Sequence, residues 1–191
     1  SLRQIVDKCL AWQRPVLMNF IDFKKAFDCI HRESLWKIAA NYGIPDKVIN
    51  IMKSLYRGSS CAVKVDGVLR EFFEIHSGVR QGCVLSPLLF GIAMDWVLKT
   101  AMKEQAGIEW VDGRRLSDLD FADDIALLND SWDGMQSVTS ALGEKAAKIG
   151  LVINVAKTKI MRVGSWTTTG RITIGPEEVE ECREFCYLGS T

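Results

Sequence analysis

The sequence predicts an α+β fold, a mostly antiparallel sheet with helices packed on one face. Short apolar runs of strand length alternate with longer segments whose apolar residues recur at helical spacing. Asp66-Gly67 separates two strand-like runs, which is the strongest short signal for a hairpin. The succession of strand, helices, hairpin, helix, hairpin, helix and strands implies antiparallel pairing. With 191 residues, 48% of them hydrophobic, the chain is long enough for one well-cored domain over residues 1–191.

The first half of the chain begins with a helix at residues 2–10, which Pro15 stops. A nearly continuous apolar run at residues 16–21 predicts a strand buried on both faces. A short segment at residues 24–28 leads to a helix from His31 that Gly43 ends. Its expected inward face is Leu35, Ile38, Ala39 and Tyr42. A further helix follows Pro45, and its expected inward face is Val48, Ile51, Met52 and Leu55.

The middle of the chain predicts hairpin strands at residues 61–65 and 68–75, followed by a glycine-bounded loop. Ser86 is the expected N-cap, and Pro87 the first residue, of a long helix that runs to about Gln105. Ser131 is the expected cap of the last helix, whose buried face is Met135, Val138, Leu142, Ala146 and Ile149. The remaining strands are expected at residues 108–111, 116–122, 125–128, 151–155, 159–163 and 185–189, around a turn at 112–113 and a loop at 165–170.

A doubled aspartate, Asp123-Asp124, lies between two apolar strands and is expected in the hairpin turn. Adjacent carboxylates repel each other, and a divalent cation would remove that cost. Taken alone, the pair is better explained as a solvated polar turn. However, the buried strand at residues 16–21 also ends in an acid, Asp22. Three aspartates from two adjacent strands would hold two Mg²⁺ ions about 3.5–4 Å apart, as polymerases and nucleases do.

Three segments resemble motifs A, B and C of a reverse transcriptase, in the same order and at similar spacing. They are Phe-Ile-Asp-Phe-Lys-Lys-Ala-Phe-Asp at 20–28, Gly-Val-Arg-Gln-Gly-Cys-Val-Leu-Ser-Pro at 78–87 and Phe-Ala-Asp-Asp at 121–124. They are most similar to those of non-LTR (LINE-like) retrotransposons, with the RTE type as one candidate. The resemblance implies a polymerase palm with incomplete fingers and thumb. Residues 1–14 would end a fingers-side helix, and residues 176–191 would begin the palm-to-thumb transition.

The same resemblance implies that Asp22, Asp123 and Asp124 are the catalytic acids and the ligands of two Mg²⁺ ions, for which Mn²⁺ could substitute. It places Phe27 at a steric gate that would collide with a ribose 2′-hydroxyl; core packing is the alternative. Phe121 replaces a tyrosine frequent in the family.

Four further residues are candidates for binding the nucleotide or the template. Arg80 and Gln81 supply side-chain donors between two glycines, and the resemblance puts Gln81 and Gly82 under the incoming nucleotide and the template base. An ordinary capped turn is the alternative for this loop. Residues 150–159 resemble motif D, which implies that Lys157 lies near the departing pyrophosphate; an exposed turn lysine is equally compatible. Residues 185–189 resemble motif E.

Composition narrows the class of protein without deciding it. The formal net charge is zero, but residues 145–176 carry six basic side chains and no acid, which suits a phosphate-tracking flank or an ordinary solvated face. The six cysteines contain no CxxC and are expected to be buried free thiols of a reducing compartment. Zinc is not expected, although Cys182 and Cys186 are closely spaced. No apolar run approaches the ~18 residues that a membrane span needs, and no signal or transit peptide is recognised.

The resemblance implies an RNA-directed DNA polymerase with an RNA template, a DNA primer or nicked target DNA, and deoxynucleoside triphosphates as partners. Fingers, most of the thumb and an endonuclease would belong to a longer polyprotein acting in the nucleus. Three alternatives remain: a catalytically silent remnant that binds RNA or protein, an RNA-dependent RNA polymerase and a Mg²⁺ phosphohydrolase. A small or polar group in place of Phe27 would suit the second, and the third does not account for residues 78–87.

Overall fold

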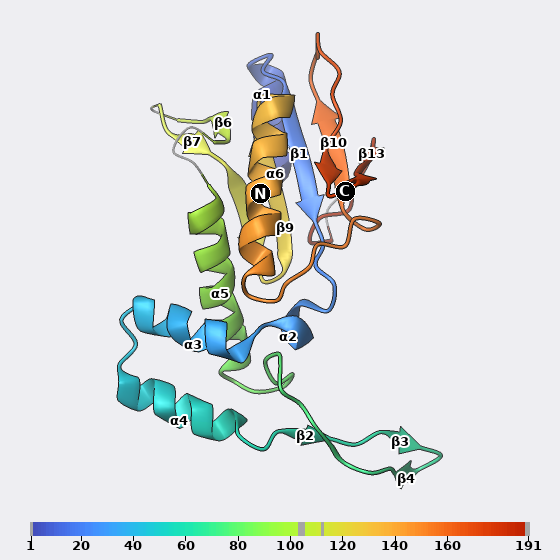
Figure 1. Cartoon of the computed structure of the whole chain (residues 1–191). Coiled ribbons are helices and arrows are strands. Elements are labelled where there is room, and N and C mark those ends of the chain that lie inside the picture. The colour runs from blue at the N-terminus through green and yellow to red at the C-terminus, as the bar shows by residue number, and fades with distance from the viewer. Residues whose placement is uncertain (1, 103–105, 112, 190–191) are drawn as a thin grey trace.

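The computed structural model describes residues 2–102, 106–111 and 113–189. At its centre lies a five-stranded sheet in the order β13-β10-β1-β9-β8 (Figure 1). These strands are β13 (Glu180–Cys182), β10 (Lys159–Val163), β1 (Val16–Ile21), β9 (Asp124–Asn129) and β8 (Asp118–Phe121). All neighbours pair antiparallel except β10 and β13, which are parallel. The predicted α+β fold with a mostly antiparallel sheet is therefore confirmed.

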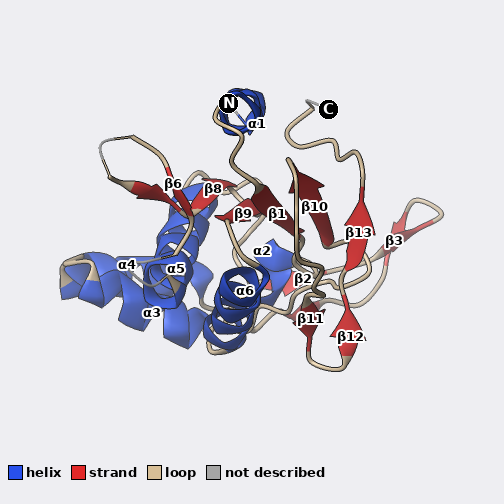
Figure 2. Cartoon of the chain, turned by 90° about the horizontal axis from the view of Figure 1, so that it is seen from above, coloured by secondary structure: helices blue, strands red, loops and turns tan. Residues whose placement is uncertain are grey.

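The central strand β1 divides the core into two layers because its side chains alternate between the faces of the sheet. Leu17 and Ile21 join the large cluster under α5 (Ser86–Ala101) and α6 (Trp132–Ala147). Val16, Met18 and Phe20 join a smaller cluster under α1 (Leu2–Ala11). Figure 2 shows α5 and α6 on one side of the sheet and α1 on the other. The predicted helical layer is thus present, and α1 adds a cover on the second face.

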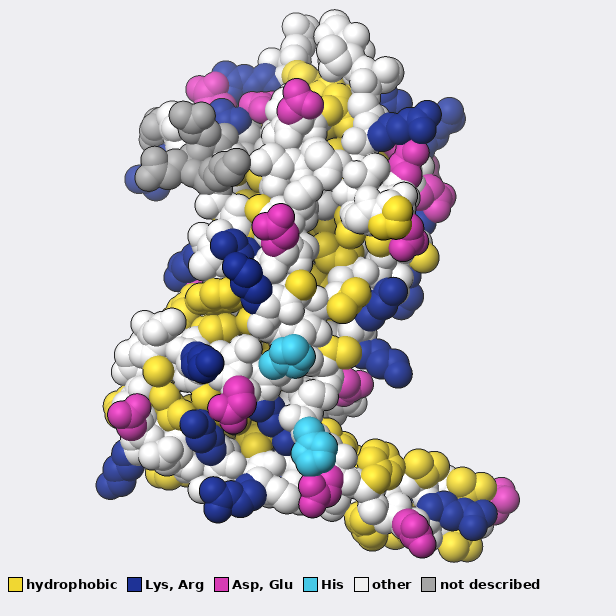
Figure 3. Space-filling model, viewed as in Figure 1, with side chains coloured by type: hydrophobic (Ala, Val, Ile, Leu, Met, Phe, Trp, Pro, Cys, Tyr) yellow, Lys and Arg dark blue, Asp and Glu magenta, His cyan; other side chains and the backbone are white. Residues whose placement is uncertain are grey.

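The segment between β1 and α5 lies beyond the end of the sheet. It contains α2 (Ala26–Cys29), α3 (Arg32–Asn41) and α4 (Asp46–Tyr56), followed by a projecting arm (Figure 1). The arm consists of β2 (Ser60–Cys61), β3 (Lys64–Val65), β4 (Val68–Leu69) and β5 (Phe73–Glu74). The hairpin at Asp66-Gly67 is confirmed, with both turn residues at positive φ, 50° and 83°. Figure 3 shows hydrophobic side chains gathered over this arm.

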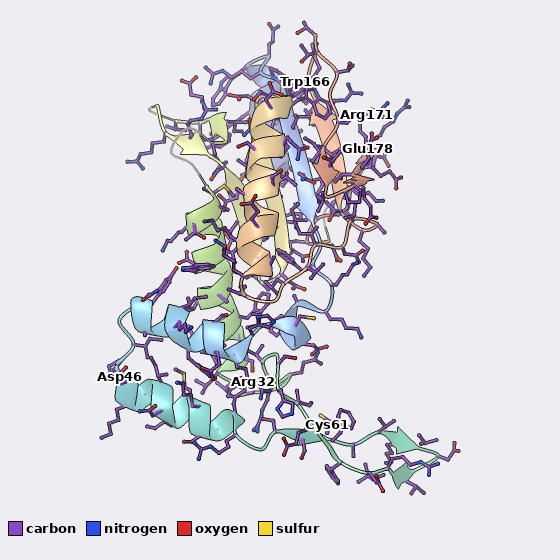
Figure 4. All side chains as sticks on the ribbon, in the orientation of Figure 1. Arg32, Asp46, Cys61, Trp166, Arg171 and Glu178 are labelled. Carbon is purple, nitrogen blue, oxygen red and sulfur yellow. The ribbon has the colours of Figure 1, made fainter. Side chains whose placement is uncertain are left out.

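The predicted inward face of α4 is wrong at three of four positions. Val48, Ile51 and Leu55 are exposed, whereas Met52 is buried, as predicted, together with Ile49 and Tyr56. Tyr56 sets the rotation of the helix. Its ring meets Trp36 of α3 edge-on, with centroids 5.6 Å apart, and lies 5.0 Å from the Arg32 guanidinium (Figure 4).

Several predicted boundaries also change. Ser86 lies inside α5 instead of capping it, since Leu85 is the N-cap and the Ser86 hydroxyl donates to the Arg80 carbonyl. Tyr42 follows α3 and is partly exposed. α5 ends at Ala101, and Gln105 lies outside the described residues. Ser131 caps α6, as predicted, by accepting from the Gly134 amide.

The C-terminal third differs most from the prediction. Residues 151–155 are joined to Phe23 by a single bridge at Ile153 and do not form a ladder. Residues 185–189 are not a strand, and the loop at 165–170 is confirmed. The small hairpins are β6 (Ile108–Glu109) with β7 (Arg115–Leu116), and the unpredicted β11 (Thr173–Ile174) with β12 (Glu177–Glu178). Residue 112 of the predicted turn lies outside the described residues.

Charge and cysteine predictions are corrected in part. Three side chains of the basic flank are paired: Lys159 with Glu180 at 2.6 Å, Arg162 with Glu181 at 2.6 Å, and Arg171 with Glu178 at 3.1 Å. The last of these pairs is labelled in Figure 4. All six cysteines are free, but only Cys9 is buried, and Cys61 and Cys186 are exposed. Among the described helices, none has the length and apolar character needed to cross a bilayer.

Candidate active site

Asp22 and Asp124 lie at the same end of two neighbouring strands. In the antiparallel register of β1 and β9, Ile21 pairs with Ile125. Asp22 follows Ile21 and Asp124 precedes Ile125, so one more step of the ladder sets the two acids opposite each other. By alternation they share the face of the sheet that carries Phe20 and the α1 cluster. The register therefore brings together two acids that are a hundred residues apart in sequence.

Asp123 and Asp124 occupy different positions in the hairpin between β8 and β9. Phe121 pairs with Asp124, so Ala122 and Asp123 are the two central residues of the turn. Asp124 is consequently the first residue of β9 and not part of the turn, which corrects the prediction by one position. Ala122 has φ 57°, a left-handed conformation that costs a side-chain-bearing residue about 1–2 kcal/mol. The tight turn exposes Asp124 and leaves Asp22 and Asp123 half-buried.

The electrostatics of this end of the sheet follow from the convergence of the acids. The pKa of Asp124 is raised, first by partial loss of hydration and then by the charges of Asp123 and Asp22. The other two carboxylates therefore both act on Asp124, and a divalent cation would relieve the repulsion among the three. Carboxylate oxygen is also the donor that Mg²⁺ prefers. The acids thus fit such an ion in charge and donor type, although within the described ranges no three His, Cys, Asp or Glu side chains form a ready-made metal-binding group.

The backbone of Asp22 is fixed by the turn that carries Lys157. The Asp22 amide donates to the Thr158 hydroxyl at 3.3 Å, and the Asp22 carbonyl accepts from the Asn154 amide at 2.8 Å. The Asn154 carbonyl in turn accepts from the Thr158 amide at 2.9 Å. Lys157 projects from this turn and is exposed. The structure therefore brings Lys157 to the strand end where Asp22 lies.

Phe27 contacts both the long helix and the glycine-bounded loop. Its half-buried ring stacks on Phe90 of α5, with centroids 4.3 Å apart and an angle of 7° between the rings. Its carbonyl accepts from the Val79 amide at 2.7 Å. A Cβ on Gly78 would lie 2.6 Å from the carbonyl oxygens of Phe27 and Asp28, so this position requires glycine. Motifs A and B are therefore joined through their backbones.

The rest of the loop is more open. Gln81 and Gly82 are exposed, and Gly82 has φ 82° with open space where a side chain would lie. The Arg80 guanidinium donates to the Ser59 hydroxyl from Nε at 3.1 Å and from Nη2 at 2.7 Å. It also lies 5.5 Å from the centre of the Tyr56 ring. Arg80 thus anchors the loop to the end of α4.

Sequence reasoning missed Tyr187, which interacts with the aspartate hairpin. Its hydroxyl lies 3.2 Å from the carbonyl oxygens of both Leu119 and Asp124. Burial, followed by the charges of Asp124 and two further acids on β8, raises the pKa of Tyr187 to about 12. The only available signal was a tyrosine within an otherwise apolar segment, which was interpreted as a plain strand.

A palm-like sheet with acids at the ends of two adjacent strands defines the polymerase class of protein. Residues 2–191 match the family described as reverse transcriptase (RNA-dependent DNA polymerase), and the chain belongs to that family.

The relatives are proteins of non-LTR elements, as the motifs predicted. The chain is 30% identical to a retrovirus-related Pol polyprotein from the R2DM element of Drosophila melanogaster, over 72% of this chain and 13% of that protein. It is 32% identical to an R2 polyprotein of Nasonia vitripennis over the same shares. It is also 27% identical to the RNA-directed DNA polymerase from mobile element jockey of Drosophila funebris, over 89% of this chain and 19% of that protein.

Solved structures confirm the fold. Telomerase from Candida tropicalis, in complex with a fragment of telomeric RNA, superposes with a TM-score of 0.64 at 18% identity. That match covers 94% of this chain and 32% of the telomerase chain. The present chain thus spans a minor part of each of these proteins.

Proposed function

We propose that the chain is the part of a retrotransposon RNA-directed DNA polymerase that supplies the catalytic acids for adding deoxynucleotides to a primer 3′-hydroxyl. The supporting observation is the register of β1 and β9, which sets Asp22 beside Asp124, next to Asp123 in the turn. The electrostatics of Asp124 support the same proposal, because the charges of Asp123 and Asp22 add to the loss of hydration in raising its pKa.

Asp22, Asp123 and Asp124 would hold two Mg²⁺ ions, with Mn²⁺ as a substitute. Reverse transcriptases generally use divalent metals. Such a pair supplies activation of the attacking oxygen and neutralisation of the leaving phosphate. The protein contributes position: hydrogen bonds from Asn154 and to Thr158 fix the Asp22 backbone, so its carboxylate needs little reorganisation to bind.

The residues around the acids would orient the nucleotide. Phe27, held against Phe90, would exclude a ribose 2′-hydroxyl. The exposed Gln81 and Gly82 would contact the nucleotide and the template base. Arg80 has guanidinium hydrogens beyond those that bind Ser59, so it could anchor the loop and still donate to the ligand. Lys157 would face the departing pyrophosphate.

The proposed partners are an RNA template, a DNA primer or nicked target DNA, and deoxynucleoside triphosphates. Fingers, the rest of the thumb and an endonuclease would come from other parts of a longer polyprotein. This proposal is supported by the R2 and jockey relatives, of which the chain spans 13% to 19%. Action on chromosomal DNA would place the enzyme in the nucleus.

The direct test is extension of a DNA primer on an RNA template by the full-length protein with Mg²⁺. Asp22→Asn, Asp123→Asn and Asp124→Asn should each lower kcat by at least ~100-fold, because each removes a charge that would hold the metals. The matched control is Asp120→Asn, which neutralises an exposed acid on the neighbouring strand and should retain activity. An unmodified protein that extends no primer, with intact fold, would instead support the silent remnant.

The sugar preference tests Phe27 separately. Phe27→Val should raise ribonucleotide incorporation relative to deoxynucleotide by about 10- to 200-fold, because one steric contact is removed. Equal use of both sugars by the unmodified protein would point to an RNA-dependent RNA polymerase.

A further inference from the structure

The hydroxyl of Tyr187 bridges the two strands that flank the aspartate turn. It is 3.2 Å from the Leu119 carbonyl oxygen of β8 and 3.2 Å from the Asp124 carbonyl oxygen of β9. One hydroxyl proton can serve both acceptors in a three-centre bond. The side chain is only 7% exposed, so little water is available to replace it at either carbonyl. The phenol therefore closes the hairpin at the residue that carries the carboxylate.

The same segment also contacts the strand that leads to Asp22. Phe185 stacks on Phe20 of β1, with centroids 4.1 Å apart and 10° between the rings. The Tyr187 ring lies 5.8 Å from the Phe20 ring. Phe20 precedes Asp22 by two residues on the same face of the strand. Residues 185–187 therefore contact both of the elements that must present their acids together.

The hairpin needs an external contact at this point. β8 is four residues long and is the edge strand of the sheet, so among the described strands it pairs with β9 alone. The turn contains Ala122 in a left-handed conformation, and the acids at the strand ends repel each other. Both effects favour opening of the hairpin tip. A hydrogen bond that spans the two strands opposes that opening.

We propose that Tyr187 is a positioning residue for the reaction, whose hydroxyl fixes the backbone at Asp124 and thereby orients the carboxylate that would bind a divalent metal together with Asp22. The proposal rests on the proposed function and deepens it. Tyr187 touches neither substrate nor metal in this role and acts only through Asp124. Its ring fills the core beside Phe20, whereas its hydroxyl sets the hairpin.

These two roles are separated by a pair of substitutions. Tyr187→Phe keeps the ring and removes only the hydroxyl, whereas Tyr187→Leu also removes the stacked ring. The matched control is Tyr42→Phe. The Tyr42 hydroxyl, at the C-cap of α3, donates to the Asp95 carboxylate of α5, so this variant also removes a hydrogen bond to an acidic residue but away from the hairpin. Burial, followed by that contact, raises the pKa of Tyr42 to about 12 as well.

The variants are compared in the full-length protein by three measurements. Primer extension gives kcat and KM for the deoxynucleotide and the Mg²⁺ concentration at half-maximal rate. Electron paramagnetic resonance gives the affinity for Mn²⁺ without any need for turnover. Hydrogen exchange gives the protection of the amides in residues 118–129.

Tyr187→Phe should lower kcat and weaken Mn²⁺ binding by about tenfold each, the factor that one lost hydrogen bond supplies. KM should stay within about twofold, because the lost hydroxyl does not contact the substrate and so does not change how tightly the substrate binds. Exchange should accelerate in residues 118–129 and nowhere else. Tyr42→Phe should change none of these values, and Tyr187→Leu should additionally expose amides of β1.

Unchanged kcat, Mn²⁺ affinity and exchange in Tyr187→Phe would overturn the proposal, as would equal losses in Tyr42→Phe. Faster exchange throughout the chain would also overturn it, because the hydroxyl would then serve stability alone. If the unmodified protein binds Mn²⁺ and extends no primer, the proposed function fails, but the Mn²⁺ and exchange measurements still decide the role of Tyr187. If it binds no Mn²⁺, both fail.

Discussion

Replacing Gly78 with alanine should test the backbone contact that joins motifs A and B. Gly78 has φ 74°, and a Cβ there would meet the carbonyl oxygens of Phe27 and Asp28 at 2.6 Å. Gly82, four residues later in the same loop, has φ 82° and nothing within 4 Å of the Cβ position. The two substitutions therefore share the conformational cost and differ in the steric one. Gly82→Ala is accordingly the matched control for Gly78→Ala.

The magnitudes follow from the contacts. A left-handed conformation costs alanine about 1–2 kcal/mol, and the lower entropy of the unfolded chain offsets about 0.4–1 kcal/mol. Gly82→Ala should therefore destabilise by about 1 kcal/mol. In Gly78→Ala the loop must also move, which breaks the amide bonds from Gly78 to Ile30 at 2.8 Å and from Val79 to Phe27 at 2.7 Å. At about 1 kcal/mol each, these losses bring the total to about 3 kcal/mol.

Urea unfolding of the two variants measures the difference. With a slope of about 2 kcal/mol per molar urea, Gly78→Ala should unfold about 1 M below Gly82→Ala. Equal midpoints would refute the reasoning, because the close approach of the loop to Phe27 and Asp28 would then carry no energy. A midpoint for Gly82→Ala equal to that of the unmodified chain would refute the shared conformational cost.

Three further predictions concern the sheet. Burial, followed by the charge of Asp120, raises the pKa of Asp118 in the folded state. The protonated carboxyl therefore contributes its full stability below the unfolded pKa of about 3.9, and this contribution is lost as the pH rises through the folded pKa. Asp118→Asn should therefore raise Tm at pH 7 and leave it nearly unchanged at pH 3. Thr139→Val should lower the free energy of unfolding, measured in urea, by about 1–3 kcal/mol. It removes the hydroxyl that accepts from the buried Asn19 amide at 2.9 Å and leaves that amide without this acceptor; adding Asn19→Leu should recover most of the lost stability. Ala122→Val should destabilise by at least about 1 kcal/mol and speed hydrogen exchange in the hairpin, because a β-branched side chain tolerates the left-handed turn poorly; unchanged exchange would contradict this.

The strands that matter for the site could be predicted from the sequence because their patterns admit one interpretation. Residues 16–21 are apolar except for Asn19, and all six are buried. The aspartates at the ends of this run and of the hairpin could be expected to converge. Which residue of the pair lies in the turn could not, because a shift of one position leaves the apolar pattern of residues 125–128 intact.

The face of α4 illustrates a different limit. Val48, Ile51 and Leu55 recur at helical spacing, but so do the residues that are actually buried, Ile49 and Tyr56 among them. Both stripes are compatible with an amphipathic helix. The choice is made by partners distant in sequence, the ring of Trp36 and the guanidinium of Arg32. The periodicity of apolar residues within α4 therefore cannot predict which of its two faces is buried.

The basic flank is only partly free to meet phosphate, for a related reason. Lys159 and Arg162 belong to β10, and their acidic partners belong to the parallel strand β13. Parallel pairing is not marked by a tight turn, so the sequence gives no local signal of which residues will meet. Of the six basic residues, Lys145, Lys148 and Lys157 are therefore better placed than the paired ones to meet phosphate.

The candidate site depends on the central strand more than on any motif by itself. Leu17 pairs with Asn129 on one side and with Arg162 on the other, so β1 meets its neighbours only after long loops have closed. Such non-local pairing forms slowly and without local guidance. The contacts that fix the backbone beside the acids are also distant in sequence. Asn154 and Thr158 bond to Asp22, and Tyr187 bonds to Asp124. The motifs therefore specify the candidate catalytic groups, whereas the completed sheet specifies where those groups lie. A substitution in β1 far from the acids should impair both stability and the alignment of the carboxylates.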